Sequence, residues 1–403
     1  MSHPSSTLPR CCRVSQAKLL RTVRKAVGSW SSVYGPSPDL VIPSGSTCQR
    51  VMKIVKGYLG KSPSSSPEES LAWFSIKKLL PPSCRCLDRP LLEGVVERLM
   101  REPVRLPSGY RRFCTKVLTR MFRKGWDVTY SQRCLSASPP LSSCLESSRQ
   151  EGGTCGYGVD RIDFLDCVEG RVAFEASNLA QAMVVQSAGK PRPLTKFSSD
   201  ALLLKPLHDT LYDFISTKKW LLRGDLRDSA LREAGFDENL GGFLISGDYA
   251  SASDRLPICI AELILDVARS SSALVPHSVW RYARAILRPK VQVSLDGQFE
   301  FEPTSGQMMG SYLCFPLLCL QNYLAFRYAM HVHGLRGRLP LLINGDDILF
   351  QSDMSFYRRW FEVVSSVGLE VEPTKTSVAA DCSWCRCGRT PSSSAATTIS
   401  TRK

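Results

Sequence analysis

The sequence contains no uninterrupted run of about 20 apolar residues, which is the length that a transmembrane helix needs. Its longest apolar stretch, residues 308–330, is interrupted by a proline, two amide side chains and an arginine. This composition predicts a helix buried in a protein core, and it predicts no transmembrane segment.

Histidine is scarce, with 5 residues among 403, and the chain begins without an apolar signal sequence. The 16 cysteines are therefore expected to be reduced thiols and not the disulfide framework of a secreted protein. Cys84 and Cys86 form a close pair, and Cys382, Cys385 and Cys387 have the spacing of a chelate. Neither set has an obvious fourth ligand nearby, so the sequence does not predict a structural zinc site.

Basic residues outnumber acidic ones: the chain has 52 Lys and Arg but 37 Asp and Glu, which gives a net charge of +15. Such an excess favours a polyanionic partner, since each phosphate that a cation neutralises releases condensed counterions. Solubility alone is an equally simple reason for a basic surface. The apolar content of 43% is sufficient for a packed core and excludes a wholly disordered chain.

The first 149 residues are interpreted as a basic helical region. Apolar periodicity predicts helices at 68–80, 91–101 and 110–123, the last of which carries five Lys or Arg residues. These cations suit a nucleic-acid backbone, and a solvated helix face is the plainer alternative. At the other end, residues 379–403 are rich in Ser and Thr and are expected to form a disordered tail.

The pattern becomes more regular between residues 242 and 378. Apolar alternation and turn residues predict a fold of the α+β class, in which helices cover an antiparallel sheet. The predicted order is a strand ending at Asp248, helices at 257–269 and 280–287, a hairpin at 291–301, a long helix after Gly310, a hairpin around Asn344-Gly345, a helix at 355–367 and a strand at 369–372.

Two adjacent carboxylates, Asp346 and Asp347, follow the Asn344-Gly345 turn between two apolar runs. Like charges this close are costly to hold together unless a divalent cation neutralises them. A second apolar run stops at Asp248. If the two strands are neighbours, Asp248 and Asp346 can share two magnesium ions, which is the arrangement that favours in-line displacement at phosphorus.

Five segments of the sequence together resemble the RNA-dependent RNA polymerases of ourmia-like viruses (botourmiavirids), with narna-like viruses as the next relatives. They occur in the order of that family and cover about half of the chain. The segments are GKPRP from residue 189, SGDYASASD from residue 246, SGQMMGSYLCFPLLCLQN from residue 305, NGDD from residue 344 and GLEVEPTK from residue 368.

The resemblance implies a right-hand polymerase fold, with fingers at 150–241 and a catalytic palm at 242–378. The palm would be an antiparallel sheet backed by helices. Residues 1–149 would precede it as a basic helical region. Only 28 residues follow Lys375, where the family has a primer grip and a helical thumb, so the thumb is expected to be missing or truncated.

The resemblance also implies roles for individual residues. Asp248 and Asp346 would hold two Mg²⁺ ions, for which Mn²⁺ is a possible substitute, and Asp347 would support that metal site. Lys375 matches a lysine that protonates the leaving pyrophosphate. Asp254 would accept a hydrogen bond from the ribose 2′-hydroxyl, which favours ribonucleotides.

Further residues would bind the nucleotide or the template. Ser305 and Gly306 correspond to a flexible loop under the templating base, and Ser311 lies where the long helix is expected to open, so that its hydroxyl faces template or nucleotide. The basic strip that would grip the triphosphate consists of Lys190, Arg192 and Lys196.

The sequence therefore predicts an RNA-directed RNA polymerase that copies a viral RNA genome from NTPs, with viral RNA as template and product. The host cytoplasm is the expected location, and the mitochondrion is the lesser alternative. Two other functions stay open: a reverse transcriptase of the group II intron or retron kind, and a catalytically inert basic RNA-binding protein. A preference for dNTP over NTP would identify the first, and RNA binding without turnover would identify the second.

Overall fold

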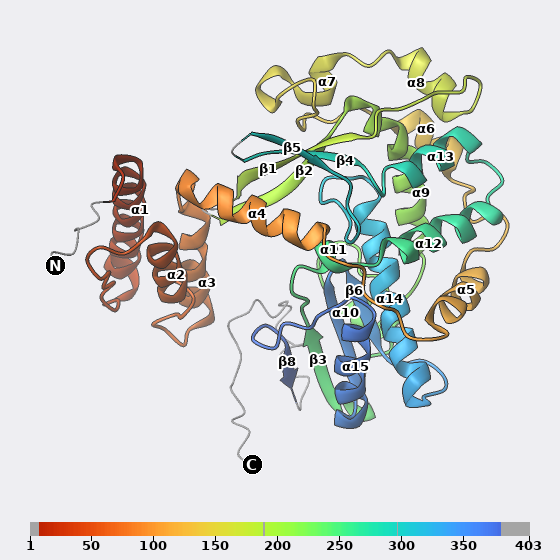
Figure 1. Ribbon diagram of the computed structural model, residues 1–403. Helices are drawn as coiled ribbons and strands as arrows, with labels where there is room; N and C mark the ends of the chain where they lie inside the picture. Colours follow the sequence, from red (N-terminus) through yellow and green to blue (C-terminus); the bar gives the residue numbers. More distant parts are fainter. Residues whose placement is uncertain (1–7, 188–189, 296, 380–403) are drawn as a thin grey trace. The chain divides into compact units, whose positions relative to one another are not determined.

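The computed structural model describes residues 8–187, 190–295 and 297–379. It is a mixed α+β fold with two four-stranded sheets (Figure 1). The described residues form two compact units. Unit 1 comprises those within Met1–Val96, Ala182–Leu194 and Ser294–Gly297, and unit 2 comprises those within Glu97–Gln181, Thr195–Val293 and Gln298–Lys403.

Unit 1 is built mainly from helices whose apolar faces meet around two tryptophans. Trp30 packs edge-on against Trp73 with a centroid distance of 5.1 Å, and its indole N–H donates to the carbonyl of Glu69 at 3.1 Å. Both rings are buried, and the indole N–H of Trp30 is the one that is satisfied. The helical elements are α1 (Arg10–Tyr34), α2 (Cys48–Tyr58), α3 (Pro67–Ser75), η1 (Ile76–Leu79) and η2 (Arg85–Leu87), and α4 (Asp88–Leu99) follows and continues into unit 2.

The sheet that carries most of the acidic motifs lies in unit 2 and has the order β6-β7-β3-β8. All of its neighbouring strands are antiparallel. The two strands β6 and β7 form the hairpin predicted at Asn344-Gly345, and β3 pairs with β7 over five positions, from Phe243 opposite Ser352 to Gly247 opposite Ile348. The strands are β3 (Phe243–Gly247), β6 (Leu341–Asn344), β7 (Asp347–Ser352) and β8 (Ser377–Ala379).

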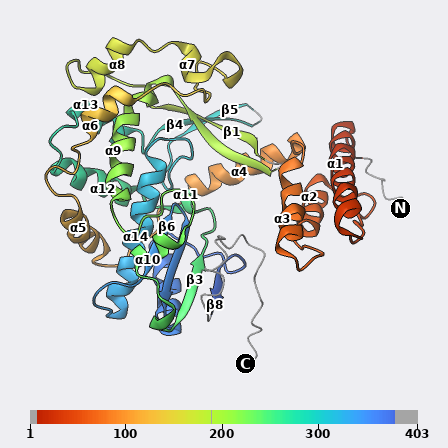
Figure 2. The same cartoon turned by 180° about the vertical axis from the view of Figure 1, so that it is seen from behind.

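Two long helices of unit 2 cover this sheet. The helix α14 (Cys314–His333) packs against α15 (Met354–Ser366) and against β6 (Figure 2). Most of α14 is buried, which confirms the buried helix expected from the interrupted apolar run at 308–330. Within the described residues, every helix is too short or too polar to cross a membrane.

The start of α14 differs from the prediction that the helix opens at Gly310 and Ser311. Its first helical residue is Cys314, because Pro316 must lie in the first turn, where its missing N–H breaks no intrahelical hydrogen bond. Ser311 instead forms a turn, in which its N–H donates to the carbonyl of Met308 at 3.1 Å.

The predicted strand at 369–372 is also different in the structure. Only an isolated bridge between Tyr249 and Val371 forms there, and the strand β8 begins further on, at Ser377. Pro373 explains the interruption, since a residue without an N–H and with a fixed φ favours a turn over a continuing ladder. The chain turns at residues 373–375 before β8 pairs with β3.

The second sheet has the order β2-β1-β4-β5. Its strands β1 and β4 are parallel, with Leu179 opposite Lys290 and Gln181 opposite Gln292. The predicted hairpin at 291–301 corresponds to β4 and β5. The strands are β1 (Leu179–Ser187), β2 (Lys190–Phe197), β4 (Lys290–Ser294) and β5 (Gln298–Phe301).

A buried carboxylate joins two loops among the remaining helices. Burial acts to raise the pKa of Asp127, but hydrogen bonds from the N–H groups of Ala273 and Leu274 and the hydroxyl of Ser272 lower it overall. The helical elements are α5 (Tyr110–Met121), α6 (Tyr130–Ser136), η3 (Arg149–Glu151), α7 (Gly153–Tyr157), α8 (Arg161–Val168), η4 (Ser199–Leu204), α9 (Lys205–Ser216), α10 (Asp228–Ala234), η5 (Glu238–Leu240), α11 (Ala252–Arg255), α12 (Ile258–Ser270) and α13 (His277–Ala285).

Candidate active site

The acidic residues of two separate motifs meet at one end of the β6-β7-β3-β8 sheet. Gly247 of β3 lies opposite Ile348 of β7, so one step beyond the ladder Asp248 comes level with Asp347. Asp346 is exposed in the turn immediately before β7. Antiparallel pairing thus brings together carboxylates that are about a hundred residues apart in the chain.

Lys375 is the cation of this group. Its Nζ lies 2.9 Å from Oδ2 of Asp248, and this hydrogen bond raises the pKa of Lys375 despite an opposing effect of burial. The negative charge of Asp346 acts in the same direction on Lys375. The structure therefore brings Lys375 together with the predicted metal-binding residues.

The carboxylates influence one another strongly. Burial, followed by the charges of Asp346 and Asp248, raises the pKa of Asp347 to about 6, and Lys375 opposes this rise. The charges of Asp346 and Asp248 contribute to this rise, and the three carboxylates together form an excess of negative charge. A bound divalent cation relieves that excess, and carboxylate oxygens are the ligands that Mg²⁺ prefers. The donor set of Asp248, Asp346 and Asp347 therefore fits magnesium.

The three carboxylates do not converge as tightly as ligands around a single ion. Among the described residues, ligand atoms of three or more His, Cys, Asp or Glu side chains come within 4.8 Å of one another in one group, and that group contains only cysteines.

One buried amide in α14 connects the two aspartate-bearing segments. The side chain of Asn322 accepts a hydrogen bond from the Tyr249 hydroxyl at 2.9 Å and donates one to the carbonyl of Gly345 at 3.1 Å. Tyr249 follows Asp248, and Gly345 precedes Asp346, so Asn322 sets the position of both segments. Asn322 ends the motif from residue 305, and the sequence pattern assigns it no role. Its buried amide, in a helix that packs against β6 of the hairpin, is the signal that points to one.

The predicted ribose-binding carboxylate lies in α11 and is already paired. Oδ2 of Asp254 accepts a hydrogen bond from Nε of Arg98 at 2.8 Å, and the hydroxyl of Ser253 donates to Oδ1 at 3.2 Å. Arg98 is a further residue that the sequence patterns did not reveal, because 156 positions separate it from its partner.

Ser305 and Gly306 pack directly against this segment. The N–H of Gly306 donates to the carbonyl of Leu256 at 2.9 Å, and a Cβ on Gly306 would lie 2.7 Å from the carbonyl oxygen of Asp254. Gly306 also has a φ of +84°, in the left-handed region. The N–H of Ser305 donates to the carbonyl of Leu99 at the end of α4. The structure thus brings Asp254, Ser305 and Gly306 into one place.

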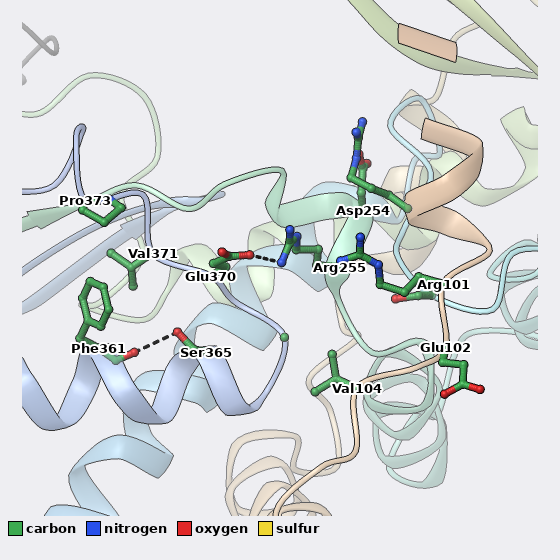
Figure 3. Close-up of a pocket in the computed structure, with 13 residues that line it drawn as sticks. Arg101, Glu102, Val104, Asp254, Arg255, Phe361, Ser365, Glu370, Val371 and Pro373 are labelled. Carbon is green, nitrogen blue, oxygen red and sulfur yellow. Dashed lines mark hydrogen bonds and ion pairs between the residues drawn. The ribbon is translucent and has the colours of Figure 1, made fainter. Parts of the chain in front are cut away.

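A pocket of about 370 Å³ opens beside Asp254 and Ser305 (Figure 3). Arg255 in α11 pairs with Glu370, which follows α15, across part of its wall. The other charged groups of the lining come mainly from α4 and the segment after it; they are Arg98, Arg101 and Glu102. Guanidinium groups converging on a hollow can bind phosphate or a carboxylate.

Ser311 and Lys196 belong to two segments that touch each other. The N–H of Thr195 in β2 donates to the carbonyl of Met309 at 2.8 Å, and a Cβ on Gly310 would lie 2.0 Å from the Thr195 carbonyl oxygen. Lys196 follows Thr195 and is half-buried, as is Ser311. Only glycine permits this approach of the two backbones.

Lys190 and Arg192 lie in unit 1, on β2, whereas the aspartates lie in unit 2. Arg192 is exposed. Contact of Lys190 and Arg192 with a nucleotide therefore stays a prediction. Three cysteines with the spacing of a chelate, Cys382, Cys385 and Cys387, lie outside the described residues.

Two known proteins share partial sequence similarity with the chain. It is 31% identical over 154 residues to the RNA-dependent RNA polymerase of Ourmia melon virus, a match that covers 34% of this chain and 17% of that protein. It is 27% identical over 161 residues to the RNA-directed RNA polymerase of Saccharomyces 20S RNA narnavirus, covering 38% of this chain and 19% of that protein. No family model matches the chain. The chain thus has distant, partial homology to these viral polymerases and spans less than a fifth of their length.

Proposed function

We propose that the chain carries the catalytic residues of an RNA-directed RNA polymerase, which copies a viral RNA genome from NTPs. The observation that carries the proposal is the meeting of Asp248, Asp346 and Asp347 at the ends of paired strands, with Lys375 bound to Asp248. The partial homology to two viral RNA polymerases supports the same function. The net charge of +15 suits an RNA template and product.

In this proposal Asp248 and Asp346 hold two Mg²⁺ ions, or Mn²⁺ in their place, and Asp347 supports them. Bound magnesium would supply electrostatic stabilisation of the attacking and leaving oxygens during nucleotidyl transfer. Lys375 holds a proton at Nζ, 2.9 Å from Oδ2 of Asp248. It is therefore placed to act as a general acid towards pyrophosphate.

Asp254 and the pocket beside it form the proposed ribose and nucleotide site. The ion pair with Arg98 keeps the Asp254 carboxylate in one orientation, so that a lone pair can accept a hydrogen bond from a 2′-hydroxyl. Ser305, Gly306 and Ser311 would contact the template or the nucleotide. The triphosphate would be gripped by the basic strip of Lys190, Arg192 and Lys196.

The proposal assigns fingers to 150–241 and a catalytic palm to 242–378, with a basic helical region at 1–149. Replication in the host cytoplasm is part of the proposal, with the mitochondrion as the lesser alternative.

The test is template-dependent incorporation of labelled NTPs by the purified chain, with and without Mg²⁺. Asp248→Asn and Asp346→Asn are expected to reduce incorporation by at least a hundredfold without a change in circular dichroism, because each substitution removes one charged metal ligand and keeps the side-chain shape. The matched control is Asp228→Asn, an exposed carboxylate at the start of α10. Retained incorporation in either site variant would remove the metal-binding role.

The same assay separates the alternative functions. A preference for dNTP over NTP would identify a reverse transcriptase, and Asp254→Asn is expected to weaken discrimination in favour of NTPs. Binding of RNA with no magnesium-dependent incorporation by the unmodified chain would identify an inert RNA-binding protein.

A further inference from the structure

Four cysteines from three separate segments of unit 1 gather at one point. Cys12 lies in α1, Cys48 opens α2, and Cys84 and Cys86 lie at η2. Their four sulfur atoms all lie within 4.8 Å of one another. Three of these side chains are buried and Cys86 is exposed. The expectation that Cys84 and Cys86 lack further ligands is therefore wrong, because the fold supplies the two that the local sequence does not show.

The spacing of the sulfur atoms matches a tetrahedral site for one metal ion. Thiolates bind Zn²⁺ at about 2.3 Å, and the edge of a regular tetrahedron of that size is about 3.8 Å. The Sγ atoms of Cys12 and Cys84 are 3.7 Å apart. A multinuclear iron–sulfur cluster places several ions between its ligands and needs a wider ring of sulfur atoms. A set this compact therefore fits a mononuclear centre.

The residues around the four sulfur atoms resemble those that surround a structural metal site. Nε2 of Gln16 donates to Sγ of Cys48 at 3.5 Å and to the carbonyl of Ser46 at 2.9 Å, so a second layer of polar contacts orients one ligand. Leu8 and Leu87 pack against the cysteines and limit access of water. The hydrogen bond from Gln16 can stabilise a thiolate on Cys48, and the leucines shield the group from exchange.

We propose that Cys12, Cys48, Cys84 and Cys86 bind one structural Zn²⁺ ion. All four protein ligands occupy the coordination sphere, which leaves no open position for a substrate and makes the site structural and not catalytic. The ion ties α1, α2 and η2 together, in addition to the apolar core that α1 and α2 share with α3. Its binding free energy then contributes directly to the folding of unit 1. The site is independent of the proposed polymerase chemistry.

The first measurement is the zinc content of the full-length chain, purified under reducing conditions and with no added metal. One zinc per chain is expected, released when a mercurial reagent blocks the thiols. Replacement of the zinc by Co²⁺ should produce the visible and near-ultraviolet absorption of tetrahedral thiolate coordination. The cysteines at 382, 385 and 387 are all changed to serine in a second preparation, which should keep the same metal content.

Two exposed cysteines of unit 1 give a matched pair of variants. Cys86→Ser removes a proposed ligand, and Cys11→Ser removes the neighbour of another ligand without touching the site. Because both side chains are exposed, neither change opens a cavity in the core. Cys86→Ser is expected to lose zinc to a chelator at least tenfold faster than the parent chain, and Cys11→Ser at the parent rate. Cys86→His, which restores a zinc ligand, should recover much of the retention.

A reduced chain that binds neither Zn²⁺ nor Co²⁺ would overturn the proposal. Equal zinc retention in Cys86→Ser and Cys11→Ser would also overturn it, as would loss of the metal when the cysteines at 382, 385 and 387 are replaced. A disulfide between any two of the four cysteines in freshly isolated protein, found by mass spectrometry together with absence of metal, would assign the group to thiol oxidation instead.

Discussion

Asn322 is expected to contribute more to stability than any other polar side chain of α14, and Asn322→Ala tests this. The substitution removes two buried hydrogen bonds, one with the Tyr249 hydroxyl and one with the Gly345 carbonyl. Both partners would then be left buried without a hydrogen bond. Each such group costs about 1–3 kcal/mol, so the free energy of unfolding should fall by roughly 2–6 kcal/mol.

The neighbouring Gln321 is a matched control. It is also buried in α14, but its amide makes no hydrogen bond to any part of the chain that the structure describes. Gln321→Leu removes an unsatisfied polar group from the core and should leave stability unchanged or raise it. The two variants therefore differ in the sign or size of their effect, although they alter adjacent amides.

The assay is urea unfolding followed by tryptophan fluorescence, with the double-mutant cycle of Tyr249→Phe and Asn322→Ala. A coupling of about 1–2 kcal/mol is expected, since the cycle isolates the single hydrogen bond between the two side chains. Asn322→Ala should also lower NTP incorporation, because the segments carrying Asp248 and Asp346 lose their common anchor. An unfolding cost for Asn322→Ala no greater than that of Gln321→Leu, or additive effects in the cycle, would refute the positioning role.

Gly247→Ala should lower the free energy of unfolding by about 1–3 kcal/mol, because the new Cβ would lie 2.8 Å from the buried ring of Trp360. Urea midpoints measure this loss. An unchanged midpoint would show that the ring moves freely. Gly306→Ala should lower the free energy of unfolding at least as much, since its Cβ would lie 2.7 Å from the Asp254 backbone and its φ is +84°. Thermal melts measure this, with Gly297→Ala as the control because a Cβ there meets open space. Asp127→Asn should destabilise the chain at pH 7, because a charged acceptor of three hydrogen bonds is lost. The folded pKa of Asp127 is lowered, so its stabilising contribution is complete above the unfolded pKa of about 3.9 and disappears as the pH falls through the folded pKa. The difference in urea midpoint between the parent chain and Asp127→Asn should therefore narrow below about pH 4. A difference that does not depend on pH would contradict this assignment.

Local patterns predicted the hairpins and the helices α3, α4, α5 and α12 to α15, since helical periodicity and turn chemistry depend on residues close together in the chain; α1, α2 and α6 to α11 were not predicted. The apolar periodicity at 110–123 corresponds to α5, and Asn344-Gly345 joins β6 to β7. Two elements start later than expected, the long helix after Gly310 and the strand expected at 369–372, and each has a proline close to its shifted start. In each case the restriction that proline places on the backbone moved the start of the neighbouring element.

The amino-acid sequence by itself determined the types of residue that the chemistry needs: aspartates at strand ends, a lysine after the last helix and cysteines able to bind metal. The tertiary structure alone decided which of them meet. Pairing of β3 with β7 aligned Asp248 with Asp347, Asn322 joined Tyr249 to Gly345, and Cys12 and Cys48 completed the set begun by Cys84 and Cys86. Such long-range contacts follow from the packing of whole elements, whose energies are summed over many residues and leave no local pattern in the chain.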